Sequence, residues 1–402
     1  MLSSADKTGT TPRFVVAPPP GGPMAAHTPE ELAALRATGA VHRVSVPGVG
    51  ESWLVVTRDA ARAALTDPRL RNDIRHSAAW ETDGGHALGR NMLQSDPPQH
   101  TRLRRLVAGH FTPARTAALR PRVERLAGEL LDALPRPGTA DLVARYALPL
   151  PVTVICEVLG VPDTARPDFH TWSNELVTPT SPEAAAAAAG ALTAYLTDLT
   201  GEKRANPDGT LLSDLTEAAD AGALTAEELL GMAFLILVAG HETTVHLISA
   251  TVHSLLTHPG RLARVRAEPD LAARAVEESL RFDSPVHTTA FRFAAEPLEL
   301  AGTPIAAGDA VLVSLAAASR DPRHFPGPDR FDIGRAPGGH LGFGHGLHHC
   351  LGAPLARLEA TVAVRLLLER CPALAFATDP ASLTWRTGAL LRGLAELPLH
   401  LG

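Results

Sequence analysis

The chain has 402 residues, of which 45% are hydrophobic and 20% charged, and its formal net charge is −6. Such a composition is ordinary for a soluble globular protein, and the negative charge gives no general attraction to nucleic acid or anionic membranes. Three cysteines are too few and too scattered for a disulfide framework, which favours a reducing cytoplasm. The longest apolar run, 229–240, is shorter than the roughly 20 residues of a membrane-spanning helix, and the N-terminus lacks the apolar core of a signal peptide. We therefore expect a cytoplasmic protein that binds neither nucleic acid nor membrane.

The first part of the chain carries one helix pattern and two strand patterns. Residues 1–19 are polar and then proline-rich, and we expect this segment to be flexible. In 28–39, Thr28 is a suitable N-cap, acidic residues fill the first turn and a glycine ends the pattern, which predicts a helix. Alternating apolar residues in 41–48 and 51–57 predict two strands.

Helical patterns dominate the middle of the chain. Ser181 as N-cap and Pro182 at the first helical position predict a capped helix in an alanine-rich stretch that resembles low complexity. Residues 297–315 return to strand patterns separated by glycine turns. No linker, repeat or long charge block divides residues 20–402, so we predict one mainly α-helical domain with small β-sheets.

The longest predicted helix runs from Thr225 to about Thr257. Thr225 and Glu228 form a capping-box pattern, and at 1.5 Å per residue the helix would be about 50 Å long. In its middle, the stretch AGHETT at 239–244 places a glycine, an acid and two hydroxyls in an otherwise apolar segment. These residues could form a solvated polar face. Because glycine and buried polar groups are costly inside such a helix, a functional site is the stronger interpretation.

A second unusual stretch, HLGFGHGLHHCLGAPLARLEA at 340–360, surrounds Cys350 with histidines and glycines. The thiol could be a small buried hydrophobe, or a zinc ligand, although adjacent His-His-Cys residues cannot all point at one ion. A third interpretation uses every residue: Gly344 and Gly346 permit a tight bend, and Gly352 lets the next helix pass close to a flat cofactor. At that helix entrance, free amides and the helix dipole lower a thiol pKa and favour the thiolate, a ligand of haem iron.

These motifs together resemble those of the cytochrome P450 superfamily. FGHGLHHCLG is similar to its haem-binding signature, AGHETT to its oxygen-activating helix, and ESLR to its Glu-x-x-Arg motif, whose two residues are Glu278 and Arg281. PDRF corresponds to the segment whose arginine, Arg330, completes a structural triad with them. The resemblance extends from about residue 20 to the C-terminus. It is strongest to soluble actinobacterial enzymes that oxidise macrolides, polyketides and sterol-like molecules.

The resemblance implies the P450 fold and a haem-thiolate monooxygenase that uses haem b and O2. It identifies Cys350 as the iron ligand and Glu242 and Thr243 as the catalytic residues that deliver protons. The residues that contact haem, including its propionates, would be His100, Arg104, Ala239, Gly240, Arg292, Phe343, Gly344, His348, Cys350 and Gly352. The substrate pocket would draw on Phe234, Leu237, Val238, His241, Val286, His287, Thr288, Thr289 and Leu390.

No nucleotide-binding fingerprint for flavin or nicotinamide is present, so electrons from NAD(P)H should arrive through a separate ferredoxin and ferredoxin reductase. We expect a monomer that docks an acidic ferredoxin on Arg102, Arg105 and Arg357 and oxidises a small apolar molecule by hydroxylation or epoxidation. Radical aryl coupling would use the same motifs and stays open. A haem sensor without turnover would not need Glu242 and Thr243.

Overall fold

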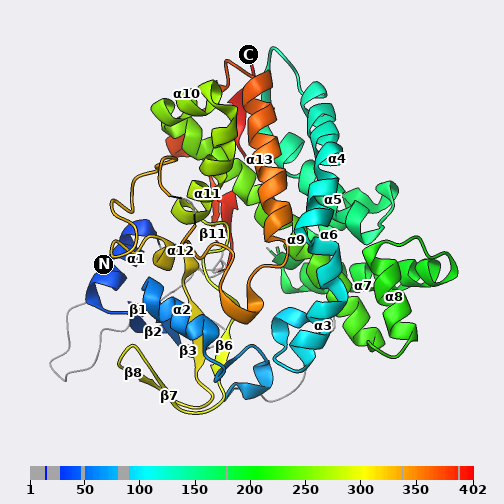
Figure 1. Ribbon diagram of the computed structural model, residues 1–402, viewed down its shortest axis with the longest axis vertical. Helices are drawn as coiled ribbons and strands as arrows, with labels where there is room; N and C mark the ends of the chain where they lie inside the picture. Colours follow the sequence, from blue (N-terminus) through cyan, green and yellow to red (C-terminus); the bar gives the residue numbers. More distant parts are fainter. Residues whose placement is uncertain are drawn as a thin grey trace.

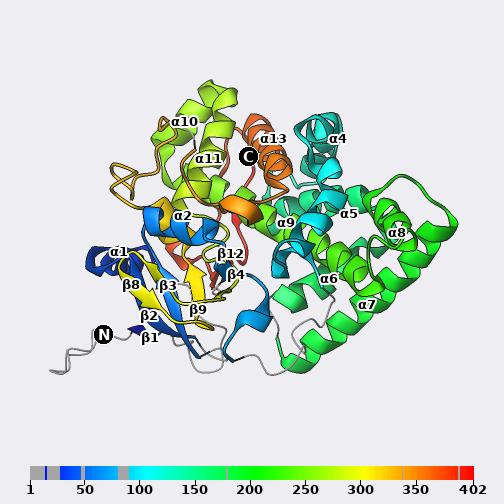
Figure 2. The ribbon, with the colours of Figure 1, turned by 60° about the horizontal axis from the view of Figure 1, so that its bottom comes forward.

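The computed structural model describes residues 14–15, 28–46, 50–79, 90–177, 180–336, 338–387 and 390–402. Figures 1 and 2 show the long helices gathered on one side of the molecule and the largest sheet on the other. The predicted class, mainly α with small β-sheets, is confirmed. The α-helices of this described part are α1 Pro29–Thr38, α2 Arg58–Thr66, α3 Gln99–Ala108, α4 Pro113–Asp132, α5 Pro149–Leu159, α6 Arg166–Val177, α7 Pro182–Ala205, α8 Leu211–Asp220, α9 Ala226–Thr257, α10 Pro259–Ala267, α11 Ala272–Phe282, α12 Leu315–Ser319 and α13 Ala353–Arg370.

Local capping chemistry sets several helix starts where the sequence predicts them. Thr28 accepts a hydrogen bond from the Glu31 amide at the start of α1, and the Glu31 side chain completes the capping box. Ser181 caps α7 in the same way, without the reciprocal acid. Thr225 and Glu228 form the capping box of α9, which runs to Thr257 as predicted.

The largest sheet has the strand order β1-β2-β3-β9-β6-β4, in which β2 and β3 are antiparallel and β3 and β9 are parallel. Its strand β1 belongs to the segment 1–19 predicted to be flexible and pairs with β2; the rest of that segment lies outside the described residues. The strands are β1 Phe14–Val15, β2 Val41–Val46, β3 Gly50–Val55, β4 Leu70–Arg71, β5 Thr139–Asp141, β6 Arg292–Ala294, β7 Leu298–Leu300, β8 Thr303–Ile305, β9 Ala310–Val313, β10 Ala375–Phe376, β11 Trp385–Thr387, β12 Arg392–Leu394 and β13 Pro398–His400.

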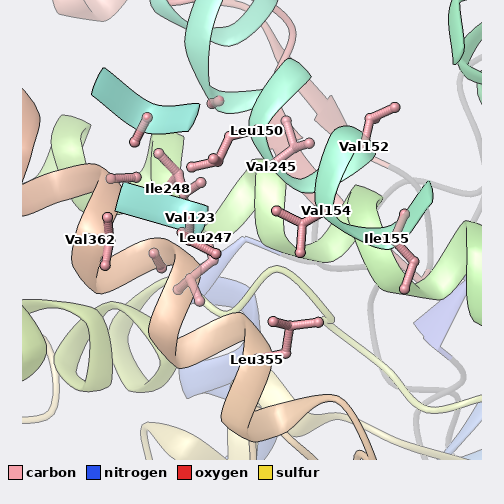
Figure 3. Close-up of a cluster of buried hydrophobic side chains, with 14 of the residues drawn as sticks. Val123, Leu150, Val152, Val154, Ile155, Val245, Leu247, Ile248, Leu355 and Val362 are labelled. Carbon is pink, nitrogen blue, oxygen red and sulfur yellow. The ribbon is translucent and has the colours of Figure 1, made fainter. Parts of the chain in front are cut away.

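Helix α9 crosses the centre of the helical side and forms the core with α4, α5 and α13. Figure 3 shows apolar side chains of all four helices in one cluster, among them Leu247 of α9 and Leu355 of α13. By length and composition α9 could cross a membrane, but 67% of its most apolar window is buried inside the protein. It is therefore the core helix of this fold, and the accessible residues in its middle need a separate explanation.

The two residues of the Glu-x-x-Arg motif form a buried ion pair on α11, which ties that helix to the segment that follows α12. Both nitrogens of the Arg281 fork donate to Glu278, at 2.8 and 2.7 Å, and both side chains are almost fully buried. Arg281 also donates to the carbonyl oxygens of Pro328 and Arg330. The expectation that the Arg330 side chain completes this triad is wrong. Arg330 is exposed and contributes only its backbone, whereas Arg335 places its Nε 3.6 Å from Glu278.

Candidate active site

A stripe of accessible side chains interrupts the buried surface of α9 at its middle. Ala239 is exposed and Thr243 is partly accessible, although the residues around them on the helix are mostly buried. Leu235, one turn earlier, is also partly accessible. Residues four apart lie on the same helix face, so these three form one line, which we call the α9 stripe. The Thr243 hydroxyl donates to the Ala239 carbonyl at 3.2 Å.

The acid beside this stripe is enclosed by the protein. Glu242 is 6% exposed and lies between two histidines, with its Oε1 3.7 Å from His241 Nε2 and its Oε2 3.7 Å from His246 Nε2. Burial lowers the pKa of His241 to about 4 and also lowers that of His246, so both rings are neutral at pH 7. Neither contact is therefore a salt bridge at that pH.

The glycine of AGHETT has a packing reason in this structure. A Cβ at Gly240 would lie 2.6 Å from the Ile155 side chain, so the absent side chain faces helix α5. The side of Gly240 that lacks a side chain is thus turned toward α5, and this packing gives no support to the predicted contact of Gly240 with a cofactor. Helix α5 approaches α9 closely because this position lacks a side chain.

The loop before α13 has the bend that its glycines predict. Gly344 and Gly346 adopt φ values of 72° and 74°, in the left-handed region that favours glycine. A Cβ at Gly346 would also lie 2.7 Å from the Leu65 carbonyl oxygen, and one at Gly352 would meet no protein atom within 4 Å. The Cys350 amide donates to the Phe343 carbonyl, and Cys350 itself is exposed. The bend therefore presents the thiol to its surroundings at the helix entrance.

The electrostatics of Cys350 differ in one respect from expectation. Although part of Cys350 is open to solvent, protein atoms surround the thiol closely, and the resulting loss of hydration raises its pKa. This effect outweighs the opposite effects of the Gly352 and Ala353 amides and of Arg104 and Arg357. The amides and charges act in the predicted direction, but the predicted net lowering of the pKa is wrong. A thiol that ligates a metal ion is deprotonated by the ion itself, so iron ligation does not depend on a preformed thiolate.

A second cluster, which we call the cationic cluster, consists of His100, Arg104, Arg292 and His348. The rings of His100 and His348 lie 4.4 Å apart, centroid to centroid. Burial, together with smaller charge effects of His100, Arg292 and Arg104, lowers the pKa of His348 to about 3. Both ring nitrogens of His100, Nε2 of His348 and Nε of Arg292 are buried without a hydrogen-bond partner among the described residues.

Among the described residues, no acid forms an ion pair with the cationic cluster. Asp96 acts on His100 and Arg292 by its charge, but its carboxylate oxygens already accept the amides of Asn72 and Asp73. Arg104 donates to the His349 carbonyl at 2.7 Å, beside the cysteine. Buried donors without acceptors are rare and indicate a missing acidic ligand. A flat cofactor with two carboxylates, ligated by Cys350, fits this set of donors, and haem is such a cofactor.

The structure divides the predicted pocket residues into two groups. Phe234, Val238, Val286, Thr288, Thr289 and Leu390 are at least partly accessible, whereas Leu237, His241 and His287 are buried. Two of the proposed polar contacts are already engaged. The ring of His241 hydrogen-bonds to the Leu237 carbonyl and to Ser173, and the Thr289 hydroxyl accepts the Val313 amide. His241 is therefore not a free polar group of the pocket, and the accessible side chains are mostly apolar.

Sequence reasoning did not name Leu235 individually and missed the partners of two arginines. Leu235 was detectable, because counting back one turn from Ala239 places it on the α9 stripe. The arginine partners were not detectable. Arg102 is paired with Glu228, and Arg357 with Glu277, each by contacts between distant parts of the chain. Three arginines were expected to dock a ferredoxin, and the positive charge of these two is balanced by the glutamates that they contact.

Comparison with known proteins supports the chemistry that this geometry suggests. Residues 176–382 match the family described as Cytochrome P450. The chain is 51% identical over 384 residues to the cytochrome P450 monooxygenase PikC of Streptomyces venezuelae, covering 94% of this chain and 92% of PikC. It is 45% identical to the vitamin D(3) 25-hydroxylase of Pseudonocardia autotrophica, covering 92% of this chain and 93% of that enzyme.

A solved structure shows the same architecture. The tirandamycin C-bound P450 monooxygenase TamI is similar with a TM-score of 0.88 at 43% sequence identity, covering 92% of this chain and 96% of TamI. At this level of identity and coverage the similarity extends to the whole fold, and the fold predicted from the sequence motifs is confirmed.

Proposed function

Because this chain belongs to the cytochrome P450 family and is a monooxygenase, we propose that it hydroxylates or epoxidises a medium-to-large apolar molecule, such as a macrolide, a polyketide or a sterol-like compound. The observation that carries this proposal is the pairing of an exposed Cys350 with the unneutralised cationic cluster. Together they fit a haem, and the mostly apolar accessible side chains of the predicted pocket fit the substrate.

We assign the binding of haem to residues on three sides. Cys350 would ligate the iron, and His100, Arg104, Arg292 and His348 would hold the propionates by charge-assisted hydrogen bonds. Ala239 on α9, and Phe343, Gly344 and Gly352 near the cysteine, would border the two faces. The bound haem supplies the iron at which O2 is activated.

In this proposal Glu242 and Thr243 move protons to the oxygen side of the haem. The Thr243 hydroxyl is accessible on the α9 stripe, and Glu242 is the buried acid next to it in sequence. One hydroxyl and one acid in an otherwise apolar helix can pass protons while keeping bulk water out of the site. A haem protein without turnover has no use for such a pair, which argues against a sensor.

The proposed substrate class rests on the apolar side chains and on the relatives. Phe234, Leu235 and Val238 of α9 and Val286 are partly accessible, and Leu390 is exposed. Burial of apolar surface contributes roughly 25 cal/mol per Å2, so a large apolar ligand gains most from these contacts. One relative is named for vitamin D(3), and one similar structure has tirandamycin C bound.

The substrate proposal is tested by titrating the ferric protein with a panel of ligands and following the Soret band. We expect a shift from low to high spin with macrolide, polyketide or sterol-like compounds, because they displace water from the iron. We expect no shift with short amino acids. A response to small charged molecules only would contradict the proposed substrate class.

The electron supply is assigned to NAD(P)H, a ferredoxin reductase and a ferredoxin, with the chain acting as a cytoplasmic monomer. Because Arg102 and Arg357 are paired with acids, Arg105 becomes the main free charge of the predicted docking face; it is exposed. Reversal of its charge, Arg105→Glu, should slow reduction by an acidic ferredoxin and weaken the salt dependence of the rate. An unchanged rate and salt dependence would place docking elsewhere.

The haem ligand is tested by Cys350→His. The ferrous–CO complex of the wild type should show the red-shifted Soret band of thiolate ligation, and the variant should lose it. Cys371→Ser serves as the control, because Cys371 is buried at the opposite end of α13. A thiolate spectrum that survives in Cys350→His would contradict the assignment.

A further inference from the structure

One buried contact of the proposed acid has no role so far. Glu242 lies between His241 and His246, and each His Nε2 is 3.7 Å from one carboxylate oxygen, which is longer than a hydrogen bond. The two histidines are on the same helix, and both are almost fully buried. Their equal distances conceal a difference in what each ring can donate.

His241 cannot donate to Glu242. Its Nδ1 is 2.8 Å from the Leu237 carbonyl oxygen, which only accepts, so Nδ1 carries the ring proton. Its Nε2 then has a lone pair and accepts from the Ser173 hydroxyl at 3.2 Å. The pKa of about 4 keeps the ring in this neutral form. The Nε2 atom therefore has no proton to offer to Oε1 of the acid.

His246 has the opposite tautomer by the same reasoning. Its Nδ1 is buried and has no hydrogen-bond partner. A Cβ at Gly393 of strand β12 would lie 1.8 Å from this nitrogen, so the backbone of β12 fills the space where a partner would stand. An unpaired buried N–H is less readily tolerated than an unpaired acceptor, so the proton belongs on Nε2, which faces Oε2 of Glu242.

The charges around His246 leave this neutral form in place. Burial is the largest effect and lowers the pKa of His246; Glu242 raises it, and Arg386 and His241 lower it. The Arg386 side chain donates a hydrogen bond to Asn174 of α6. His246 is thus a neutral donor one helical turn from the acid, which is the spacing at which side chains of a helix meet.

We propose that His246 is a positioning residue for Glu242: its Nε2–H binds Oε2 and leaves Oε1 to gain and lose the transferred proton. A small side-chain rotation would shorten the 3.7 Å contact to a hydrogen bond. No other hydrogen bond to this carboxylate is found among the described residues, so without this donor it could turn away from Thr243. This inference rests on the proposed function, because His246 would orient the acid that the proposed function assigns to proton transfer.

The tautomers provide a test that is independent of turnover. In the ferrous–CO holoprotein labelled with 15N-histidine, we expect His246 to show a protonated Nε2 and a bare Nδ1, and His241 to show the reverse. Signals are assigned by comparison with His246→Gln and His241→Gln. A His246 protonated on Nδ1 would overturn the proposal, whatever the activity of the enzyme.

Turnover tests the role of the contact. His246→Leu removes the donor and should lower product formed per nicotinamide consumed by about fivefold, the effect of one lost hydrogen bond, with peroxide rising in its place. His246→Gln keeps an N–H at nearly the same position and should recover most of the coupling. Equal coupling in the leucine and glutamine variants would overturn the proposal.

Two further variants separate positioning from general damage to α9. Gly393→Ala would place its Cβ against Nδ1 and displace the ring, so it should reproduce the loss of coupling seen with His246→Leu. His253→Gln is the matched control, because His253 is on the same helix and makes edge-to-face contacts with Phe376 and Trp385. Normal coupling in Gly393→Ala would contradict the arrangement.

Failure of the proposed function would look different. If Thr243→Ala leaves coupling unchanged while the thiolate spectrum is intact, the proton relay itself is misassigned. The histidine tautomers would still report on the contact between His246 and Glu242. If Thr243→Ala lowers coupling but the His246 variants leave it unchanged, the proton relay is correct and only the inference that His246 positions Glu242 fails.

Discussion

Two buried polar clusters of this protein differ in how well their groups are paired. In the network on α11, the Arg281 fork meets the Glu278 carboxylate and nearby carbonyl oxygens, and Glu278 also accepts the Asp332 amide. In the cationic cluster, both nitrogens of His100 and Nε of Arg292 have no partner in the described protein. The first cluster is complete as part of the fold. The second lacks such partners, and this difference supports its proposed role as the site that binds the propionates.

The comparison separates structural from functional burial by a physical criterion. A buried charge is costly unless it is paired, so selection for stability alone would not retain several unpaired donors at one place. Arg292 shows the cost directly, because burial lowers its pKa to about 10. An anionic ligand would stabilise a cluster of this kind by pairing its donors. The following variants test this distinction, from the largest expected effect to the smallest.

Breaking the complete network should cost the most stability. Arg281→Ala leaves the Glu278 carboxylate buried without its cation, and we expect a loss of about 3–5 kcal/mol in the free energy of unfolding. Urea unfolding of the haem-loaded protein measures it. Arg330→Ala is the control: its side chain is exposed, so the change should stay within about 0.5 kcal/mol. A large effect of Arg330→Ala would restore the triad predicted from sequence.

Removing a member of the cationic cluster should instead weaken ligand binding. Arg292→Leu deletes one donor to a propionate, and a hydrogen bond to a charged group is worth about 1.5–3 kcal/mol, which corresponds to about ten- to hundredfold. We expect haem to transfer to an acceptor globin faster by this factor. The apoprotein should lose no stability, because an unpaired buried cation is removed. Arg43→Leu is the control, because the Arg43 side chain is exposed. If the wild-type apoprotein unfolds more slowly than the Arg292→Leu apoprotein, Arg292 stabilises the fold itself, and a purely ligand-binding role is contradicted.

A third buried group sharpens the comparison because it is neither paired nor cationic. Both oxygens of Glu359 on α13 lack a partner among the described residues, and burial raises its pKa well above the ordinary value. The folded protein therefore keeps the proton at pH values where the unfolded chain loses it. This contribution to stability is complete below about pH 4.3 and declines as pH rises toward the folded pKa, by about 1.4 kcal/mol per pH unit.

Glu359→Gln removes this dependence. The stability of the variant relative to the wild type should increase as pH rises from 5 to 7, measured by urea unfolding of the holoprotein. The exposed Glu299→Gln should show no such trend. Parallel curves for Glu359→Gln and wild type would show that Glu359 has a partner, such as a bound water, that stabilises its ionised form.

Features that depend on neighbours within about four residues were predictable from the sequence. The capping boxes of α1 and α9, the glycine bend before Cys350 and the Glu278–Arg281 pair all involve short separations along the chain. At these distances the backbone geometry of a helix or turn already decides which groups meet. The motifs for the haem ligand and the oxygen-activating helix are local in the same sense.

The contacts that only the tertiary structure decided join distant parts of the chain. Sequence spacing could not show that Arg335 rather than Arg330 reaches Glu278, that Arg102 is paired with Glu228, or that Ser173 occupies a nitrogen of His241. It could not show that Gly393 confines His246 either. The sequence determined the helices, the strands and the chemical types of the site. Packing decided which groups are paired, because pairing depends on the distances between elements, and those distances are set by the whole core.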